Sequence, residues 1–188
     1  PVHAASSAAA SAARSEPGSA GTSAPASESA LPPMVCLTFD DGPSRTTPAV
    51  LEALADEEVP ATFFVVANEN NERYLPLIRQ AQQAGHEIAL HSASHRYSDI
   101  YRSTGAFWAD IELLRQRIAP YADAAAIACL RFPGGSTNTV SRKYGGDAIM
   151  QDLKAQAEAR GWRWVDWNVS AEDAAGKKLS AEEICRNV

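Results

Sequence analysis

Short apolar segments alternate with amphipathic segments from about residue 35 to the end of the chain. The apolar runs are rich in β-branched and aromatic residues and are bounded by turn-forming residues, which predicts buried strands. We expect strands at residues 35–39, 61–66, 86–90, 127–130 and 162–169. Between them, apolar residues recur every three or four positions, which predicts helices. We expect these helices at residues 47–54, 72–84, 104–121, 147–160 and 181–188.

Regular alternation of strands and helices predicts an α/β fold with a parallel sheet and right-handed crossovers. Each candidate functional residue follows directly after a predicted strand, as active-site residues do on the carboxyl side of a β/α barrel. An open doubly wound sheet, with its site where the strand order reverses, is the main alternative.

Two adjacent carboxylates end the first predicted strand. The apolar run through Phe39 is followed by Asp40 and Asp41 and then by the turn-forming pair Gly42 and Pro43. Neighbouring anions repel each other unless a cation lies between them, so the pair indicates a bound metal or a proton-transfer site. Successive strand residues point to opposite faces, which would give the two carboxylates different roles. Taken alone, a solvated polar turn is the simpler interpretation.

Two further strand ends carry candidate functional side chains. The third strand is followed by His91-Ser92-Ala93-Ser94-His95, a spacing from which both imidazoles can face one point. Two His and one Asp are a common ligand set for catalytic Zn²⁺, with the fourth position open for water. The fourth strand ends at Arg131-Phe132-Pro133-Gly134-Gly135.

In this order and at these intervals, the three motifs resemble those of the polysaccharide deacetylases, also called NodB-homology domains or carbohydrate esterase family 4. The resemblance covers about residues 33–188, and the three motifs in register are strongly specific. It implies a distorted (β/α) barrel with parallel strands. It also implies a hydrolase that removes acetyl groups from N-acetylglucosamine residues of a glycan. Bacterial members that act on peptidoglycan are the most similar, and chitooligosaccharides and acetylxylan are alternative substrates. An inactive relative that only binds glycan or metal is a further alternative.

The resemblance implies a role for each motif residue. Asp41, His91 and His95 would bind one divalent metal ion, Zn²⁺ or another transition metal such as Co²⁺. Asp40 would act as the general base that takes a proton from water. Arg131 would pair with Asp40 and hold it ionised and oriented, the alternative being an Arg that caps strand-end carbonyls.

Two later segments would form the rest of the substrate groove. The backbone N–H of Gly134, which replaces an aromatic residue common in the family, would donate to the oxyanion. Asp166 and Trp167 loosely resemble a fourth motif that forms one groove wall. Many members have an Asp where this chain has Ser170, so Asp166 or Asp173 would support Arg131 instead. Trp167 is alternatively a core aromatic. The polar loop at residues 135–146 is predicted to line the groove.

Composition narrows the class of protein further. The net charge of −6 and pI of about 5.2 argue against binding nucleic acid through a basic face and are compatible with a neutral glycan. Of the three cysteines, Cys36 and Cys129 fall in predicted buried strands, so we expect small core side chains. A bridge between them would require that their strands are neighbours.

Residues 1–33 are mostly Ala, Ser, Gly, Pro and Thr, which predicts a disordered linker before a catalytic domain at 34–188. Such spacers are typical of extracytoplasmic enzymes tethered to a membrane or cell wall. The family resemblance implies a general-acid His in a Leu-x-His motif after the fourth motif, yet all four histidines lie at or before His95. We therefore expect a longer protein, in which the next ~20 to 30 residues complete the barrel and supply this His. The 188-residue chain alone should hydrolyse N-acetyl groups poorly or not at all.

Overall fold

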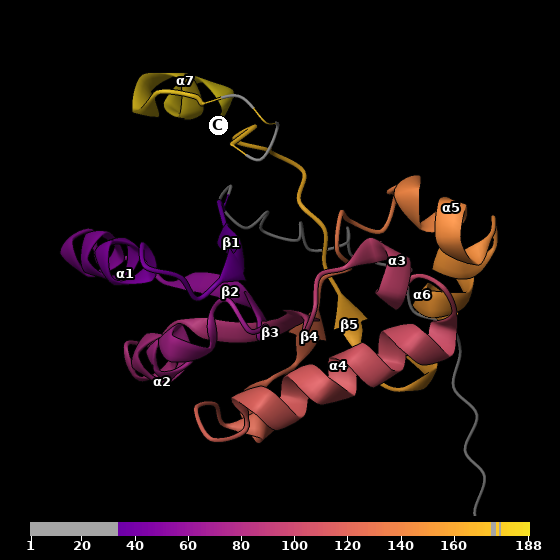
Figure 1. The fold of residues 1–188 in the computed structure, drawn as a ribbon. Coiled ribbons are helices and arrows are strands. Elements are labelled where there is room, and N and C mark those ends of the chain that lie inside the picture. The colour runs from indigo at the N-terminus through magenta and orange to yellow at the C-terminus, as the bar shows by residue number, and fades with distance from the viewer. Residues whose placement is uncertain (1–33, 174–175, 177) are drawn as a thin grey trace, which may run out of the picture. The chain divides into compact units, whose positions relative to one another are not determined.

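In the described part of the chain, five parallel strands form one sheet in the order β1-β2-β3-β4-β5 (Figure 1). The structure, a computed structural model, describes residues 34–173, 176 and 178–188. The strands are β1 Leu37–Gly42, β2 Ala61–Val66, β3 Glu87–Ser92, β4 Cys129–Leu130 and β5 Arg163–Trp164. Their order follows the chain without the reversal of a doubly wound sheet. The predicted parallel α/β fold of the barrel type is therefore confirmed.

Helices connect successive strands. Their bounds are α1 Thr47–Asp56, α2 Pro76–Gln83, α3 Tyr97–Ile100, α4 Thr104–Ile118, α5 Val140–Gly145, α6 Ile149–Ala159 and α7 Ala181–Asn187, with 3₁₀ turns at η1 Glu72–Tyr74 and η2 Ala124–Ala126. Helices α2 and α4 pack against β3, α6 packs against β5, and α1 contacts α2. None of the helices described is long and apolar enough to cross a bilayer.

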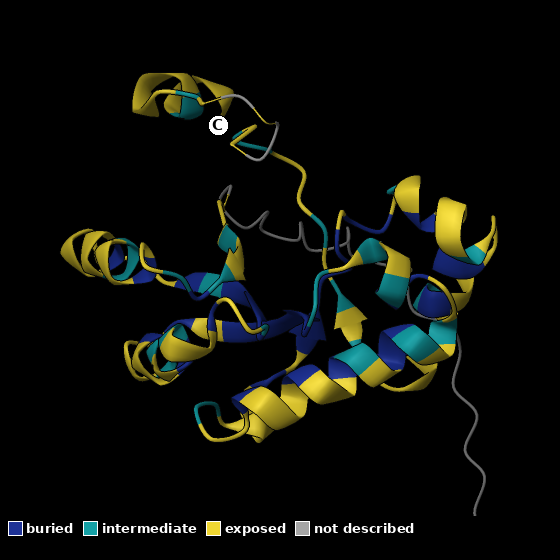
Figure 2. Ribbon diagram, viewed as in Figure 1, coloured by how far each residue is buried: buried dark blue, intermediate teal, exposed yellow. Residues whose placement is uncertain are grey.

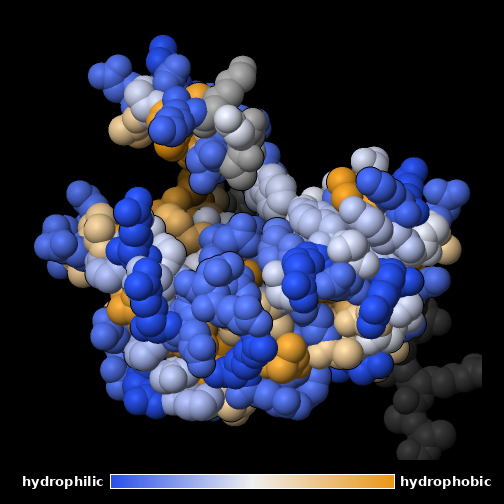
Figure 3. Space-filling view, in the orientation of Figure 1, coloured by the Kyte–Doolittle hydropathy of each residue, from blue (hydrophilic) through white to orange (hydrophobic). Residues whose placement is uncertain are grey.

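The main core lies between the sheet and these helices. In β2 and β3, alternate residues such as Phe63 and Ile88 face the helices and are buried, as the period of a strand requires (Figure 2). The opposite face of the sheet carries a smaller buried cluster of Phe64, Ala89 and Cys129. The visible surface is mostly hydrophilic, with small separate apolar patches (Figure 3).

Helix α4 shows how local sequence sets the fold. Its N-cap Ser103 accepts a hydrogen bond from the Ala106 N–H at 3.1 Å, which satisfies one of the free amides of the first turn. Apolar residues three or four positions apart then face the sheet, and these are Phe107, Ile111, Leu114 and Ile118. Because α4 packs directly on β3, it lies beside the motif that follows this strand.

The first strand is less buried than predicted. β1 lies at the edge of the sheet, so Leu37 keeps 37% of its surface exposed. Val35 precedes the strand and keeps 80% exposed. Cys36 is exposed, whereas Cys129 is buried as predicted. Both thiols are free, and β2 and β3 separate their segments. The bridge between these two cysteines therefore does not form.

Several element bounds also differ from the prediction. The fourth strand begins at Cys129 instead of residue 127, and the fifth ends at Trp164 instead of residue 169. Pro133 follows β4 and has no N–H for a ladder, which limits how far β5 can pair. The predicted polar loop at residues 135–146 contains α5, a helix too short to show clear periodicity. The predicted linker at residues 1–33 lies outside the described residues.

Candidate active site

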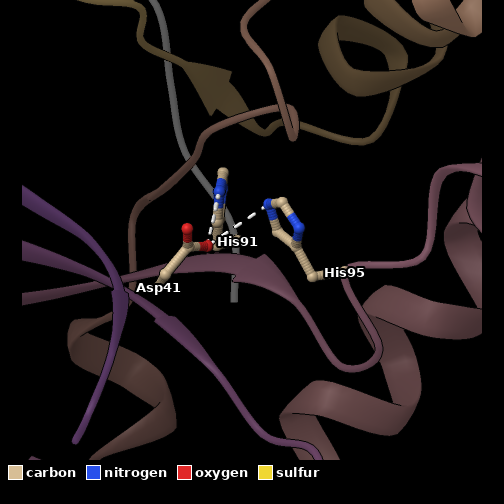
Figure 4. Close-up of side chains that lie close together, drawn as sticks. All are labelled: Asp41, His91 and His95. Carbon is tan, nitrogen blue, oxygen red and sulfur yellow. Dashed lines mark ion pairs between the residues drawn. The ribbon is translucent and has the colours of Figure 1, made fainter. Parts of the chain in front are cut away.

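Asp41, His91 and His95 come together at the carboxyl ends of β1 and β3 (Figure 4). The Oδ1 atom of Asp41 lies 3.5 Å from Nε2 of His91 and 3.3 Å from Nε2 of His95. Two ligands of a tetrahedral Zn²⁺ ion with bonds of about 2.0–2.1 Å lie roughly 3.3 to 3.4 Å apart. The spacing and the two-nitrogen, one-oxygen donor set therefore fit a single divalent metal ion.

A β-bulge presents each of the first two ligands. Between β1 and β2, the residues Asp40 and Gly42 pair with consecutive residues of β2, so Asp41 is the extra residue of a register shift. The same shift occurs between β2 and β3, where His91 is passed over. Bulges are frequent beside active sites because they change the direction of a side chain. This explains how Asp40 and Asp41, although adjacent, reach different partners.

Two of the three candidate ligands have left-handed backbone conformations. The φ angle is +65° at Asp41 and +53° at His95. A non-glycine residue in this region is uncommon, and such strain persists where the surrounding contacts impose it. Its presence at two ligands of one cluster supports a functional interpretation of the cluster.

Asp110 of α4 fixes the loop that carries His95. Its Oδ2 accepts hydrogen bonds from the Ser92 hydroxyl at 2.6 Å and the Ala93 N–H at 2.7 Å. Its Oδ1 accepts one from the Ser94 N–H at 3.0 Å. The Ser92 hydroxyl oxygen in turn accepts the His95 N–H at 2.8 Å. One carboxylate thus holds the turn between the two histidines.

The sequence analysis missed Asp110. The available signal was its position, three residues after Phe107 and four before Leu114, which places an acidic residue beside the buried stripe of an amphipathic helix. An acid at such a position needs hydrogen-bond donors, because a buried charge without partners is costly. The pattern could indicate that donors exist but not where they lie.

The tautomer of His91 follows from its hydrogen bond to a main-chain carbonyl. Nδ1 lies 2.8 Å from the oxygen of Arg131, and a carbonyl can only accept, so Nδ1 carries the proton. Nε2 therefore presents its lone pair toward Asp41. Burial lowers the pKa of His91 below its ordinary value, although Asp40 and Asp41 act to raise it. A neutral, oriented imidazole is the form that binds a metal.

Arg131 is buried and connects three strands. Nη1 donates to Asp40 Oδ1 at 2.7 Å and to Thr38 Oγ1 at 2.9 Å. Nε donates to the carbonyl of Val165 at 3.0 Å, and Nη2 to that of Asp166 at 3.3 Å. The two interpretations offered for this residue are therefore compatible, since it pairs with the carboxylate and also caps strand-end carbonyls.

The residues of the loose fourth motif are only partly as predicted. The Asp166 carboxylate accepts the Ser136 N–H at 2.9 Å and the Ser136 hydroxyl at 2.6 Å, so its side chain supports the third motif and not Arg131. Asp173 is exposed. Trp167 keeps 44% of its surface exposed, which excludes the core alternative. Its ring centroid lies 5.4 Å from the Arg131 guanidinium, so the structure brings it to the site.

Gly134 and Tyr97 lie against each other at the edge of the site. Gly134 has a φ of +78°, and no backbone carbonyl of the described residues accepts a hydrogen bond from its N–H. This N–H is therefore available to a ligand, as the assignment of an oxyanion donor requires. A Cβ at Gly134 would meet the hydroxyl of Tyr97 at 2.7 Å. Burial and the negative charge of Asp41 both raise the pKa of Tyr97, a residue that the sequence analysis missed.

Comparison with known proteins identifies the family. The family model described as polysaccharide deacetylase matches residues 28–151. The chain belongs to the polysaccharide deacetylase family. A solved structure, the catalytic domain of a peptidoglycan N-acetylglucosamine deacetylase from Eubacterium rectale, is 42% identical with a TM-score of 0.76. That match covers 81% of this chain and 68% of the other.

Two curated relatives differ in the substrate that their names give. A chitooligosaccharide deacetylase from Bradyrhizobium is 36% identical over 75% of this chain and 58% of the relative. A peptidoglycan-N-acetylglucosamine deacetylase from Bacillus cereus is 31% identical over 82% of this chain and 50% of the relative. This chain thus spans about half the length of curated relatives that it matches.

Proposed function

We propose that this chain belongs to a metal-dependent hydrolase that removes acetyl groups from N-acetylglucosamine residues of a glycan, with peptidoglycan as its substrate, and that it carries the metal ligands and the base of that enzyme. One observation carries the proposal: a three-residue metal-ligand set lies beside Asp40, a carboxylate held by a buried arginine. A metal-binding structural site would need only the ligands. A separately oriented carboxylate next to them adds the base that hydrolysis requires.

Each residue of the site has a role in this reaction. Asp41, His91 and His95 would hold the metal, whose Lewis acidity lowers the pKa of a water molecule and polarises the acyl carbonyl. Asp40 accepts the proton of the attacking water, and Arg131 keeps its carboxylate in position. The water oxygen adds to the acyl carbon. The C–N bond then breaks as the nitrogen takes up a proton from the general-acid His that the family resemblance implies, to give acetate and a free amine.

The charge that develops on the acyl oxygen needs hydrogen-bond donors. The N–H of Gly134 would supply one from a fixed main-chain position. Because the donor belongs to the backbone, the absence of a side chain at this position does not remove it. The half-exposed ring of Trp167, held near the third motif, would form part of the wall along which the sugar lies.

The relatives' names support the substrate class, since they include peptidoglycan and chitooligosaccharide deacetylases. Peptidoglycan is preferred because the relative with 42% identity bears that name. We also propose an extracytoplasmic location, for which the Ala/Ser/Pro-rich segment at residues 1–33 and the substrate itself provide the support. Zn²⁺ is the proposed metal because the ligand spacing fits its tetrahedral geometry.

Acetate release by the intact protein tests the proposal directly. N-acetylglucosamine oligomers, peptidoglycan fragments and acetylxylan are compared as substrates before and after chelation, dialysis and return of Zn²⁺ or Co²⁺. We expect release from the N-acetylated substrates that is lost on chelation and restored by metal. Full activity in the chelated, dialysed protein would contradict the metal assignment. Selective release from acetylxylan would contradict the substrate class.

A further inference from the structure

Tyr97 connects the metal-ligand loop to the third motif. It is the first residue of α3 and follows His95 by two positions. Its ring meets the His95 imidazole edge-on, with centroids 5.5 Å apart and an interplanar angle of 86°. At its other end, its hydroxyl lies beside Gly134. The phenol therefore spans the distance between a candidate metal ligand and the candidate oxyanion donor.

The geometry at Gly134 depends on this phenol. A Cβ there would lie 2.7 Å from Tyr97 Oη and 3.2 Å from Tyr97 Cε1, and the φ of +78° also disfavours a side chain. The volume that a side chain at residue 134 would occupy is thus filled by the end of Tyr97. The aromatic hydroxyl beside Gly134 therefore comes from Tyr97, in the segment after His95, and not from a residue of the third motif.

Two neighbouring tyrosines use their hydroxyls differently. The rings of Tyr97 and Tyr101 lie 5.7 Å apart. Tyr101 is buried and donates to the carbonyl of Pro133 at 2.7 Å, so its hydroxyl is occupied in holding the third motif. Tyr97 is half-buried, and within the described residues its hydroxyl has no hydrogen-bond partner. A phenol is protonated at neutral pH and can donate a hydrogen bond.

We propose that Tyr97 is a catalytic residue whose hydroxyl donates a hydrogen bond to the acyl oxygen of the substrate, together with the N–H of Gly134. This inference rests on the proposed function. A donor aimed at the place where negative charge develops acts mainly in the transition state, so its loss lowers kcat more than it raises KM.

Tyr97→Phe removes the donor and keeps the ring that packs on His95. The matched control is Tyr121→Phe. Tyr121 follows the C-terminal end of α4 and precedes β4, so it lies toward the amino ends of the strands, whereas the candidate site lies at their carboxyl ends. For each protein, kcat and KM for acetate release from N-acetylglucosamine oligomers are measured with Zn²⁺ affinity and melting temperature. We expect Tyr97→Phe to lower kcat about 10- to 100-fold with unchanged Zn²⁺ affinity and melting temperature. The control should behave as the wild type.

Wild-type kcat in Tyr97→Phe would overturn the inference, and so would a loss of kcat that follows a loss of Zn²⁺ affinity. If the intact wild-type protein binds the oligomers but releases no acetate, the proposed function fails by itself. Tyr97 is then judged by the calorimetric affinity of the Zn²⁺-loaded protein for acetate, whose negatively charged oxygen the hydroxyl would bind, and an unchanged affinity in Tyr97→Phe would overturn the inference. If the wild type neither binds nor hydrolyses the oligomers, both proposals are wrong.

Discussion

Nη1 of Arg131 lies 2.7 Å from Oδ1 of Asp40, and both side chains are at least partly shielded from water. The main-chain carbonyl of the same arginine accepts the Nδ1–H of His91 at 2.8 Å. Arg131 therefore orients the candidate base with its side chain and a candidate metal ligand with its backbone. A substitution at residue 131 removes the first contact and leaves the second in place, so the two roles can be tested separately.

We expect Arg131→Lys to lower turnover by ~10²-fold while metal affinity stays within a few-fold of the wild type. Lysine keeps the charge but lacks the planar fork that reaches Asp40 and the strand-end carbonyls at once. Unfolding free energy should fall by about 1–3 kcal/mol, because a lysine cannot make all the hydrogen bonds of the buried guanidinium. Acetate release, Zn²⁺ titration and urea unfolding measure the three effects. Parallel loss of metal affinity and turnover would show that the arginine supports the whole site.

The adjacent carboxylates should separate in function. Asp41→Asn removes the negative charge of the carboxylate whose Oδ1 lies 3.3 and 3.5 Å from the two imidazoles, so metal occupancy should fall sharply. Asp40→Asn should keep the metal and lose the proton acceptor, so turnover should drop by ~10²-fold or more. Metal content of the purified variants and acetate release distinguish the two. Equal loss of metal in both variants would mean that the roles are divided wrongly.

The sequence predicted the strand alternation, and three residues that it singled out, Asp41, His91 and His95, lie together in the structure. This was feasible because the three motifs each end a strand, and parallel strands place their carboxyl ends together. The burial of β1 was not predictable from its composition. An apolar run indicates a strand but not whether that strand has one neighbour or two. Leu37 is exposed because β1 has one neighbour in the described sheet, and Val35 is exposed because the strand begins only at Leu37.

The finer geometry depends on contacts between distant segments. The bulges at Asp41 and His91 arise from pairing with β2, and no local pattern marks them. Asp110 acts on a turn 16 to 18 residues away, and Tyr97 meets a glycine of a different motif. Such residues are specified by packing and not by periodicity. Their roles therefore cannot be predicted from the pattern of a single sequence.

Asp110 should control metal affinity without binding metal. Asp110→Asn keeps the size of the side chain but replaces one acceptor oxygen by an NH₂ group, so part of the hydrogen bonding to residues 92–94 is lost. We expect Zn²⁺ affinity to fall 10- to 100-fold, as is typical when a group supporting a metal ligand is removed. Asp152→Asn, an exposed position on α6, is the matched control. Unchanged Zn²⁺ affinity in Asp110→Asn would show that His95 is held by other contacts.

His86 should make the stability of the fold depend on pH. Its imidazole is 7% exposed, its Nδ1 accepts the N–H of Ala61 at 3.3 Å, and burial lowers its pKa. Protonation removes this acceptor, so His86 is harder to protonate in the folded state than in the unfolded state, where a histidine takes up its proton near pH 6.5. As pH falls through ~6.5, the unfolded state therefore binds more protons and the free energy of unfolding decreases.

For this single group, the decrease is at most about 1.4 kcal/mol per pH unit between the unfolded pKa and the lowered folded one. His86→Asn isolates the effect, because the Asn oxygen can take the place of Nδ1 as acceptor and does not titrate, while the other histidines remain. Urea unfolding of the metal-free protein at pH 5 to 8 compares the two slopes. We expect the variant to lose less stability than the wild type below pH 6.5. Equal slopes would show that His86 is protonated as readily in the folded protein as in the unfolded chain.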